Sequence, residues 1–475
     1  MPQERLAKIV CTIGPASFPE GIIEQMVRAG MDVARLNFSH GTHAEHRQAI
    51  ERIRSVEARV GKPVAILQDL QGPKIRLGTF ATGSAMLRRG EVFVLTARSV
   101  EGSASRATIT YADFARDVKA GDRVLIDDGR IALDVEDTED GDVRCRVVTG
   151  GLVRDHKGVN LPSTALRLGV LTDKDREDLE FGLRHGVDYV GVSFVRSAAD
   201  ILEVREVINE YRSDAQVVAK LERPEALGRL DEILSATTAV MVARGDLGVE
   251  MPLEEVPIAQ KEIIRKAKLA RTPVIVATQM LESMVSASRP TRAEVSDVAN
   301  AVLDGTDAVM LSAESATGSY PVEAVRTLDR IIRRTESAFP PATMDRPRRG
   351  EVSFPQAISD AAAFSAQELK ARAIVAFTQS GSTARLISQD RPPVPIIAFA
   401  PTERIRRRLA LDWGVIPRLI RRYATIDEMV AAIEQSLLAD RSVRYNDILI
   451  IVAGAPLGVR GTVNLLKLHR VGEHR

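Results

Sequence analysis

Short apolar runs rich in β-branched residues alternate with longer amphipathic segments along most of the chain. Near-continuous apolar runs indicate strands buried on both faces, as in a parallel sheet covered by helices. The intervening segments repeat their apolar positions with the period of a helix. The runs span residues 8–14, 33–38, 64–70, 189–195, 216–222, 239–247, 273–280 and 308–315, and the main helical segments span 20–30, 43–61, 173–186, 198–212, 258–271 and 293–305.

Strands that are each followed by a helix, repeated eight times, predict a (β/α)8 (TIM) barrel. An open, doubly wound sheet in two halves is the alternative, and the eightfold repeat argues against it. The predicted barrel comprises residues 1–72 and 170–345.

Residues 73–169 interrupt this alternation and are too many for a crossover between two barrel strands. They contain short alternating runs separated by Gly, Asp and Thr turns, which predicts an all-β segment. We expect a small inserted β-barrel domain that sits over the barrel mouth as a lid. Its predicted strands span 91–97, 106–111, 122–128, 131–137 and 142–148.

A segment rich in Pro, Arg and Gly at 344–352 predicts a linker. Beyond it the αβ alternation resumes, so residues 346–475 are expected to form a third, α/β domain. Its predicted strands span 373–379, 394–400, 414–420 and 447–454.

Composition and charge narrow the class of protein. The chain has 475 residues, 45% of them hydrophobic and 27% charged, which is ordinary for a soluble multi-domain protein. A formal net charge of +1 gives no reason to expect a nucleic-acid binder. The basic run at 404–408 is interpreted as a solvated helix face.

Cysteine and histidine usage argues against disulfides and zinc. Cys11 and Cys145 are the only cysteines, so no disulfide framework is possible. His40, His43 and His46 form the densest histidine group, without a further ligand type. The N-terminus does not resemble a signal peptide, and no apolar run approaches membrane-spanning length, so a cytoplasmic location is expected.

In a parallel barrel, the catalytic and binding residues lie where the strands end and the loops begin. Reading the ends of the predicted strands therefore gives candidate site residues without reference to any motif. These are Arg35, Asn37, Ser39, His40, Asp69, Lys220, Glu222, Arg244, Gly245, Asp246, Thr278, Gln279, Ser312 and Glu314.

Lys220, Glu222 and Asp246 bring an ammonium and two carboxylates together from neighbouring strands. Two carboxylates with spare water positions suit Mg²⁺. Arg35 and Lys220 beside such a metal suit a phosphoryl group. The alternative is a buried ion-pair network that only fills the barrel mouth, but such networks are weak stabilisers.

Several long segments, in this order along the chain, resemble the signature segments of the pyruvate kinase family. The resemblance covers the barrel and both domain joins and is weaker in the inserted and C-terminal domains. The segments are CTIGPAS (11–17), ARLNFSHG (34–41), DLQGPKIR (69–76), KGVNLP (157–162), DEIL (231–234), VARGDLGVE (242–250), ATQMLESM (277–284) and the stretch from SDVAN to VEAV (296–325).

The resemblance implies a glycolytic enzyme that transfers a phosphoryl group from phosphoenolpyruvate to ADP. Glu222 and Asp246 would hold Mg²⁺ or Mn²⁺, and Asp246 would also lie at the substrate. Lys220 would stabilise the phosphoryl group, Arg35 would clamp it, and the backbone of Gly245 would touch the substrate carboxylate. Thr278 would help to protonate the enolpyruvate carbon through a water relay.

The same resemblance implies that Asn37, Phe38, Ser39 and His40, together with Arg76 and Lys157, contact the nucleotide. For Arg76 and Lys157 the alternative is ordinary surface charge. Their matching positions at the two joins of the inserted domain favour a function.

Family members that bind K⁺ use residues matching Asn37, Ser39, Asp69 and Leu70, and carry a glutamate where this chain has Lys74. The resemblance implies that Lys74 supplies the charge of the missing cation, so that K⁺ is not required. The alternative is that Lys74 points into solvent without a role.

TQSGST at 378–383 follows a predicted strand and precedes a helix, which suits a phosphate nest. The loop matches the effector phosphate loop of the family, whose members often bind fructose 1,6-bisphosphate or another phosphorylated metabolite. The resemblance therefore implies that an effector phosphate binds at Thr378, Ser380, Gly381, Ser382 and Thr383. Simple helix capping is the alternative. The segment 454–467 lacks the tryptophan of some bisphosphate-binding relatives, which leaves the effector's identity open. A homotetramer is also implied.

Two other functions compete with this one. A magnesium-enolate aldolase or lyase would explain Glu222 and Asp246, but neither the lid, Lys220 nor the nucleotide-side cations. A catalytically silent metabolite sensor would predict the loss of a site residue, and none is lost.

Overall fold

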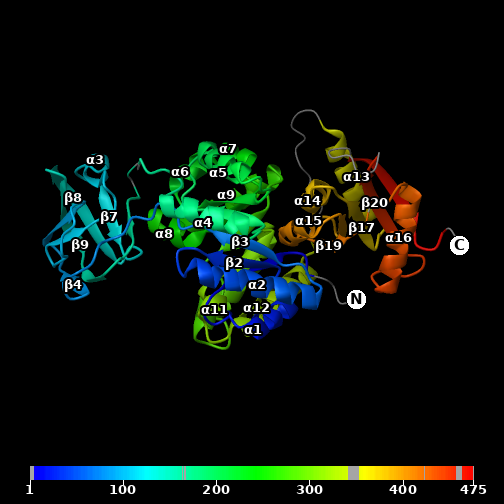
Figure 1. Cartoon of the computed structure of the whole chain (residues 1–475), viewed down its shortest axis with the longest axis horizontal. Helices are drawn as coiled ribbons and strands as arrows, with labels where there is room; N and C mark the ends of the chain where they lie inside the picture. The colour runs from blue at the N-terminus through cyan, green and yellow to red at the C-terminus, as the bar shows by residue number, and fades with distance from the viewer. Residues whose placement is uncertain are drawn as a thin grey trace.

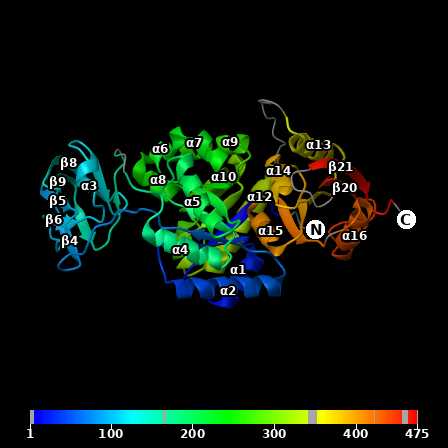
Figure 2. The same cartoon turned by 45° about the horizontal axis from the view of Figure 1, so that its top comes forward.

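The computed structural model describes residues 5–162, 164, 167–340, 352–421, 423–455 and 463–473. Three bodies lie in a row, with the inserted domain at one end, the barrel in the middle and the C-terminal domain at the other end (Figures 1 and 2). The predicted linker lies outside the described residues except for Val352. None of the helices in the described ranges is both long and apolar enough to cross a membrane.

The central body is a closed barrel of parallel strands, which confirms the (β/α)8 prediction and excludes the open sheet. Its first strand pairs with both the second strand and the last, as closure requires. The strands, in barrel order, are β1 (Lys8–Ile13), β16 (Ala308–Leu311), β15 (Val274–Ala277), β14 (Ala239–Ala243), β13 (Gln216–Leu221), β12 (Tyr189–Val192), β3 (Ala65–Asp69) and β2 (Val33–Asn37).

Three of the barrel helices begin at a threonine that caps them. Thr42, Thr172 and Thr291 each accept a hydrogen bond from the backbone of an acidic residue three positions on, whose side chain bonds back. The predicted helices are confirmed as α1 (Glu20–Ala29), α2 (His43–Val60), α4 (Asp173–Arg184), α5 (Ala198–Glu210), α9 (Val256–Leu269) and α10 (Arg292–Asp304), and α6 (Pro224–Gly228), α7 (Leu230–Ala236), α11 (Ala313–Ala316) and α12 (Pro321–Ala338) add to them.

The sixth barrel strand is shorter than predicted. A strand over 239–247 is wrong, because β14 ends at Ala243 and helix α8 (Arg244–Glu250) starts at once. The apolar Leu247, which is fully buried, extended the strand-like pattern into what is the buried face of a short helix. Asp246 therefore lies in the first turn of a helix, not on a strand.

The inserted domain has its own apolar core, which includes Phe93, Leu95, Val124 and Leu133. One six-stranded sheet has the order β11-β7-β8-β9-β5-β6, and β10 pairs with β4. The domain projects from the barrel beside α8 (Figure 1). Its elements are β4 (Ser84–Leu87), β5 (Val92–Thr96), β6 (Arg106–Thr108), α3 (Phe114–Asp117), β7 (Arg123–Ile126), β8 (Ile131–Glu139), β9 (Asp142–Thr149), β10 (Gly151–Arg154) and β11 (Val159–Asn160).

The two segments that connect this domain to the barrel lie side by side. Arg76 and Gly158 form an antiparallel bridge. The Leu77 amide donates to the Lys157 carbonyl at 2.9 Å, and the Val159 amide donates to the Ile75 carbonyl at 2.9 Å. The outgoing and returning chains are thus hydrogen-bonded into one narrow connection.

The C-terminal domain is a five-stranded sheet in the order β19-β18-β17-β20-β21, and all but the last strand are parallel. The antiparallel edge strand β21 was not predicted. The elements are α13 (Phe354–Glu368), β17 (Ala373–Phe377), α14 (Ser382–Gln389), β18 (Ile396–Ala400), α15 (Glu403–Arg408), β19 (Val415–Leu419), α16 (Ile426–Ala439), β20 (Ile448–Gly454) and β21 (Val463–Arg470).

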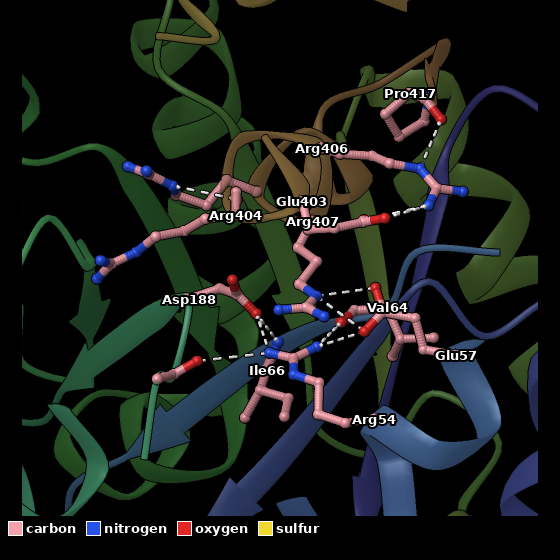
Figure 3. Close-up of polar contacts among 12 residues, drawn as sticks. Arg54, Glu57, Val64, Ile66, Asp188, Glu403, Arg404, Arg406, Arg407 and Pro417 are labelled. Atoms are coloured by element: carbon pink, nitrogen blue, oxygen red, sulfur yellow. Dashed lines mark hydrogen bonds and ion pairs between the residues drawn. The ribbon is translucent and has the colours of Figure 1, made fainter. Parts of the chain in front are cut away.

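The basic run at 404–408 is not a solvated face, and that interpretation is wrong. Arg407 Nε lies 2.8 Å from Glu57 Oε2 on α2. Arg404 and Arg408 both pair with Asp214, and Arg406 donates to the Gly61 carbonyl at 2.5 Å. Figure 3 shows Arg407 facing Glu57, with Arg54 and Asp188 of the barrel beside them. The run joins the C-terminal domain to the barrel, because its acidic partners Glu57 and Asp214 belong to the barrel domain.

Apolar residues reinforce this junction. Ala410 and Leu411 pack in one cluster with side chains inside the barrel, among them Val10 and Val33. The Tyr189 hydroxyl donates to the Arg408 carbonyl at 2.6 Å. The C-terminal domain therefore closes the amino-terminal end of the barrel and leaves the opposite end for the site.

Candidate active site

The site centres on Lys220, which projects from the end of β13 and is buried. Its Nζ lies 2.8 Å from Glu222 Oε1 and 3.1 Å from Asp69 Oδ1, and it donates to Ser193 Oγ at 2.7 Å. Burial lowers the pKa of Lys220, but Asp69 and Glu222 outweigh it and bring the pKa above its usual value. The side chain is therefore a fixed ammonium.

Asp69 joins Lys220 to Arg35. Arg35 Nε lies 2.6 Å from Asp69 Oδ2, and its Nη1 donates to Thr12 Oγ1 at 2.9 Å. Burial raises the pKa of Asp69, but Lys220 and Arg35 outweigh it, so the pKa falls below its usual value. This carboxylate is charged and orients both cations from the middle of the site.

Glu222 and Asp246 provide two further carboxylates. Glu222 Oε2 accepts from the Phe194 amide at 2.8 Å. Burial raises the pKa of Glu222, and Lys220 opposes that rise while the nearby Asp246 adds to it. Asp246 is partly exposed, and its Oδ1 lies 3.4 Å from Lys74 Nζ.

These two carboxylates fit a divalent cation. Among the described residues, no group of three or more His, Cys, Asp and Glu side chains is arranged to hold a metal ion, and Glu222 and Asp246 offer a pair of carboxylates. Mg²⁺ accepts this arrangement, because it commonly keeps waters and takes substrate oxygens as its other ligands. The pKa of Glu222, raised in part by Asp246, reflects a repulsion that a bound cation would relieve.

Thr278 lies just beyond β15, beside the first turn of α8. Its backbone has a φ of 73°, and Gln279 follows at 55°. The Gly245 amide donates to Thr278 Oγ1 at 3.1 Å. The structure therefore brings Thr278 and Gly245 together, as the sequence predicted for residues at the ends of adjacent strands.

The residues assigned to the nucleotide form two groups. Asn37 Oδ1 accepts from the Ser39 amide at 3.2 Å, and His40 is exposed. Phe38 is buried, and its ring stacks on His46 at 3.9 Å between centroids, so its side chain faces away from solvent.

Arg76 and Lys157, the second group, are neighbours on the connection to the inserted domain. Arg76 Nη1 donates to the His156 carbonyl at 3.1 Å, and Lys157 Nζ lies 2.6 Å from Asp127 Oδ1. Both cations thus have partners within the inserted domain itself.

The residues of the monovalent-cation pattern lie around Asp69. The Leu70 carbonyl accepts from Ser193 Oγ at 2.8 Å, and Ser193 Oγ in turn accepts from Lys220. Lys74 does not point freely into solvent, because its ammonium is paired with Asp246. That contact argues against the alternative in which Lys74 points into solvent without a role.

The histidine group does not converge. His43 Nε2 lies 2.7 Å from Asp178 Oδ1, and His46 Nε2 lies 3.0 Å from the His40 carbonyl. The His43 and His46 rings thus each have a partner outside the other two imidazoles.

The loop at 378–383 has the form expected of a turn before a helix. Gly381 has a φ of +96° and its amide donates to Thr378 Oγ1 at 2.8 Å. Ser380 Oγ and Ser382 Oγ are exposed and lie 3.0 Å apart, while Thr383 is buried in the first turn of α14. Residues 456–462 of the late segment lie outside the described residues.

Sequence reasoning missed Thr12, Ser193 and the Phe194 amide. Thr12 is near the end of β1, and Ser193 and Phe194 directly follow β12, so the rule that found Lys220 would also have found them. They were missed because the apolar runs at 8–14 and 189–195 extend past them, so the sequence pattern places them inside predicted strands and not at their ends.

Comparison with known proteins decides the family. Residues 4–325 match the family model described as "Pyruvate kinase, barrel domain", and residues 356–469 match "Pyruvate kinase, alpha/beta domain". The chain belongs to the pyruvate kinase family. It is therefore a phosphotransferase, and the resemblance drawn from its sequence is confirmed.

Curated pyruvate kinases are similar over the whole chain. The chain is 49% identical over 473 residues to the pyruvate kinase of Mycobacterium tuberculosis, covering 99% of both. It is 46% identical to that of Corynebacterium glutamicum, covering 99% of this chain and 98% of the relative. A crystal structure of a pyruvate kinase from Cryptosporidium parvum is 35% identical with a TM-score of 0.92, covering 98% of this chain and 96% of the other. An aldolase or lyase is excluded by this match.

Proposed function

We propose that this pyruvate kinase family member transfers the phosphoryl group of phosphoenolpyruvate to ADP, giving pyruvate and ATP. The observation that carries the proposal is the buried Lys220 ammonium between Asp69 and Glu222, with Arg35 on the far side of Asp69. Phosphoryl transfer depends on positioning and charge neutralisation more than on covalent help. Two oriented cations beside a carboxylate pair supply both.

Each residue then has a role. Arg35 binds the phosphate. Lys220 stabilises the phosphoryl group during its transfer, because three partners hold its ammonium in place. The Gly245 amide lies at the substrate carboxylate, and Thr278 serves the protonation of the enol carbon. Glu222 and Asp246 would hold Mg²⁺ or Mn²⁺, which when bound neutralises phosphoryl and enolate oxygens.

The nucleotide is proposed to bind between the Asn37–His40 segment and the pair Arg76 and Lys157. The hydrogen-bonded connection supports this, because it places both cations on one ribbon that would carry them toward the barrel when the lid closes. Closure would exclude the water that competes with ADP for the phosphoryl group.

We further propose that the enzyme does not require K⁺. Lys74 supports this proposal because it adds a built-in positive charge beside Asp246, and a positive charge in the site disfavours binding of a further cation. A second cation beside Asn37, Ser39, Asp69 and Leu70 would be repelled by it.

Regulation and assembly complete the proposal. A phosphorylated metabolite is proposed to bind at the 378–383 loop, supported by the exposed hydroxyls of Ser380 and Ser382 before α14. A homotetramer is supported by large apolar side chains left exposed on two helical surfaces. They are Phe354 and Phe364 on α13, Leu253 in the short 3-10 helix before α9, and Ile258 in the first turn of α9. The domain limits 1–72 with 170–345, 73–169 and 346–475, and a cytoplasmic location, stay predictions.

A coupled assay tests the activity directly. Pyruvate formation from phosphoenolpyruvate is measured with and without ADP and with and without Mg²⁺. Pyruvate should form only when both are present. Formation without ADP would point to a phosphatase, and no formation under any condition would leave the silent sensor as the better hypothesis.

A further inference from the structure

The turn after β15 stores backbone strain at a residue assigned to catalysis. Thr278 and Gln279 both have positive φ angles. A β-branched residue is strained in this region of backbone conformation and persists only where the surroundings fix it. Something in the fold must therefore hold Thr278 in place.

Arg244, the first residue of α8, is hydrogen-bonded to the backbone of this turn. Its Nη2 donates to the Thr278 carbonyl at 2.6 Å, and its Nε lies 3.2 Å from both the Ala277 and the Thr278 carbonyls. Its Nη1 lies 2.8 Å from Asp297 on α10, which orients the guanidinium. The planar guanidinium of an arginine has enough donors, in a fixed geometry, to bond two neighbouring carbonyls and a carboxylate at once.

Glu314 holds the other end of the same turn. Its fully buried carboxylate accepts from the Leu281 amide at 3.0 Å and from the Ser312 amide at 2.7 Å. The turn is thus anchored by α8, which follows β14, on one side and by α11, which follows β16, on the other.

The hydroxyl of Thr278 is oriented by the same helix start. Because the Gly245 amide donates to Oγ1, the hydroxyl's own hydrogen must point elsewhere. A Cβ at residue 245 would lie 2.9 Å from Thr278 Cγ2, so only a glycine allows this approach. Arg244 and Gly245 therefore fix the carbonyl and the hydroxyl of one residue.

We propose that Arg244 is a positioning residue for proton transfer, because it keeps Thr278 in the one backbone conformation that presents a free hydroxyl hydrogen to the barrel mouth. This inference rests on the proposed function. In the step, the electron pair of the enolate C2=C3 bond takes up a proton at C3 and the C2 oxygen becomes the ketone. The proton passes from the Thr278 hydroxyl through a water, and the hydroxyl regains one from solvent.

The test separates proton transfer from phosphoryl transfer. Exchange of the pyruvate methyl hydrogens in D₂O, with Mg²⁺ and ATP present, is followed by NMR on the full-length enzyme. The steady-state KM for phosphoenolpyruvate is measured on the same variants.

Thr278→Val and Arg244→Met should each slow the exchange about a hundredfold, with KM near that of the wild type. Arg244→Lys should retain part of the exchange, since an ammonium keeps one carbonyl hydrogen bond. Arg184→Met, on an exposed arginine of α4, is the matched control and should exchange normally.

The outcomes separate this inference from the proposed function. Normal exchange in Arg244→Met while Thr278→Val is slow would overturn the role of Arg244. If Arg244→Met does not fold, Asp297→Asn and Arg244→Lys decide, and normal exchange in both would overturn it. Equal losses of exchange and of affinity for phosphoenolpyruvate would also overturn it, because they indicate general distortion. A wild type that makes no pyruvate from phosphoenolpyruvate and ADP would instead refute the proposed function.

Discussion

At the scale of single residues, positively and negatively charged side chains alternate through the site. Replacing any one of them removes a partner from its neighbours and destabilises the site. Lys220 has two carboxylate partners, and Asp69 has two cationic partners. All of these side chains are buried or nearly so. Removing one partner leaves a buried charge uncompensated, which is more costly than the intact pair is stabilising.

Replacing Lys220 by methionine should reduce kcat by about a thousandfold, since the donor that neutralises the moving phosphoryl group is lost. Lys266→Met, on a lysine of α9 paired with the exposed Asp231, is the control and should leave kcat unchanged. Stopped-flow measurement of ATP formation checks this. Phosphoryl transfer at near wild-type rate in Lys220→Met would refute the role of the ammonium.

Lys74→Glu should convert the enzyme to one that needs K⁺, because the variant exchanges a built-in cation beside Asp246 for a carboxylate. The wild type should turn over at nearly its full rate in buffer whose only monovalent cation is tetramethylammonium. Strong activation of the wild type by K⁺, or an unchanged cation response in Lys74→Glu, would count against the proposal.

The sequence located most of the strand-end residues of this site, but not all of the contacts among them. Parallel strands bring their carboxyl ends together, so Arg35, Asp69, Lys220 and Glu222 could be located by position alone. The pairing of Lys74 with Asp246 could not, since it depends on how the connection to the inserted domain leaves the barrel.

At the scale of elements, the barrel depends on close approach between helices and strands. Gly182 on α4 lies against Gln68 of β3, and a Cβ there would be 2.0 Å from Gln68 Oε1. The Gln68 amide also donates to the Asp178 carbonyl at 2.6 Å, so it has little freedom to move away. Helix α4 can reach this position only with a glycine.

Gly182→Ala should destabilise the protein by about 1–3 kcal/mol, the usual cost of overpacking a core. Gly21→Ala in α1 is the matched control, because nothing lies within 4 Å of its added methyl group. Urea unfolding followed by circular dichroism measures both. Equal midpoints for the two variants would contradict the close approach.

Elements with strong local signals were predicted well, and those set by tertiary context were not. The capping boxes of α2, α4 and α10 mark their starts in the sequence. Helix α8 carries no side-chain cap and follows a buried strand without a turn residue, so its pattern reads as a longer strand. Strand β21 has mixed burial along its length, which hides its period.

At the scale of the whole molecule, α15 joins the C-terminal domain to the barrel through arginines. Arg407 and Glu57 are the best-defined pair, with two contacts below 3 Å and the glutamate buried. The sequence could show that the run is basic, but not that its partners lie in another domain.

A double-mutant cycle with Arg407→Met and Glu57→Gln should give a coupling energy of about 1–3 kcal/mol, as for charged hydrogen bonds with a buried partner. The exposed pair Arg184 and Glu180 is the control and should couple by less than about 0.5 kcal/mol. Thermal unfolding at low and high salt measures both cycles. Equal coupling in the two pairs would show that the junction is no stronger than a surface contact.

Barrel closure has a consequence for synthesis on the ribosome. Lys8 of the first strand pairs with Ala308 of the last, so the barrel can close only after nearly two thirds of the chain has emerged. The inserted domain is complete well before that and has its own core. We expect the inserted domain to fold first. Until the last barrel strand has been synthesised, the apolar side chains of β1 to β3 stay exposed to solvent. Those three nascent strands are the part of the chain most in need of a chaperone.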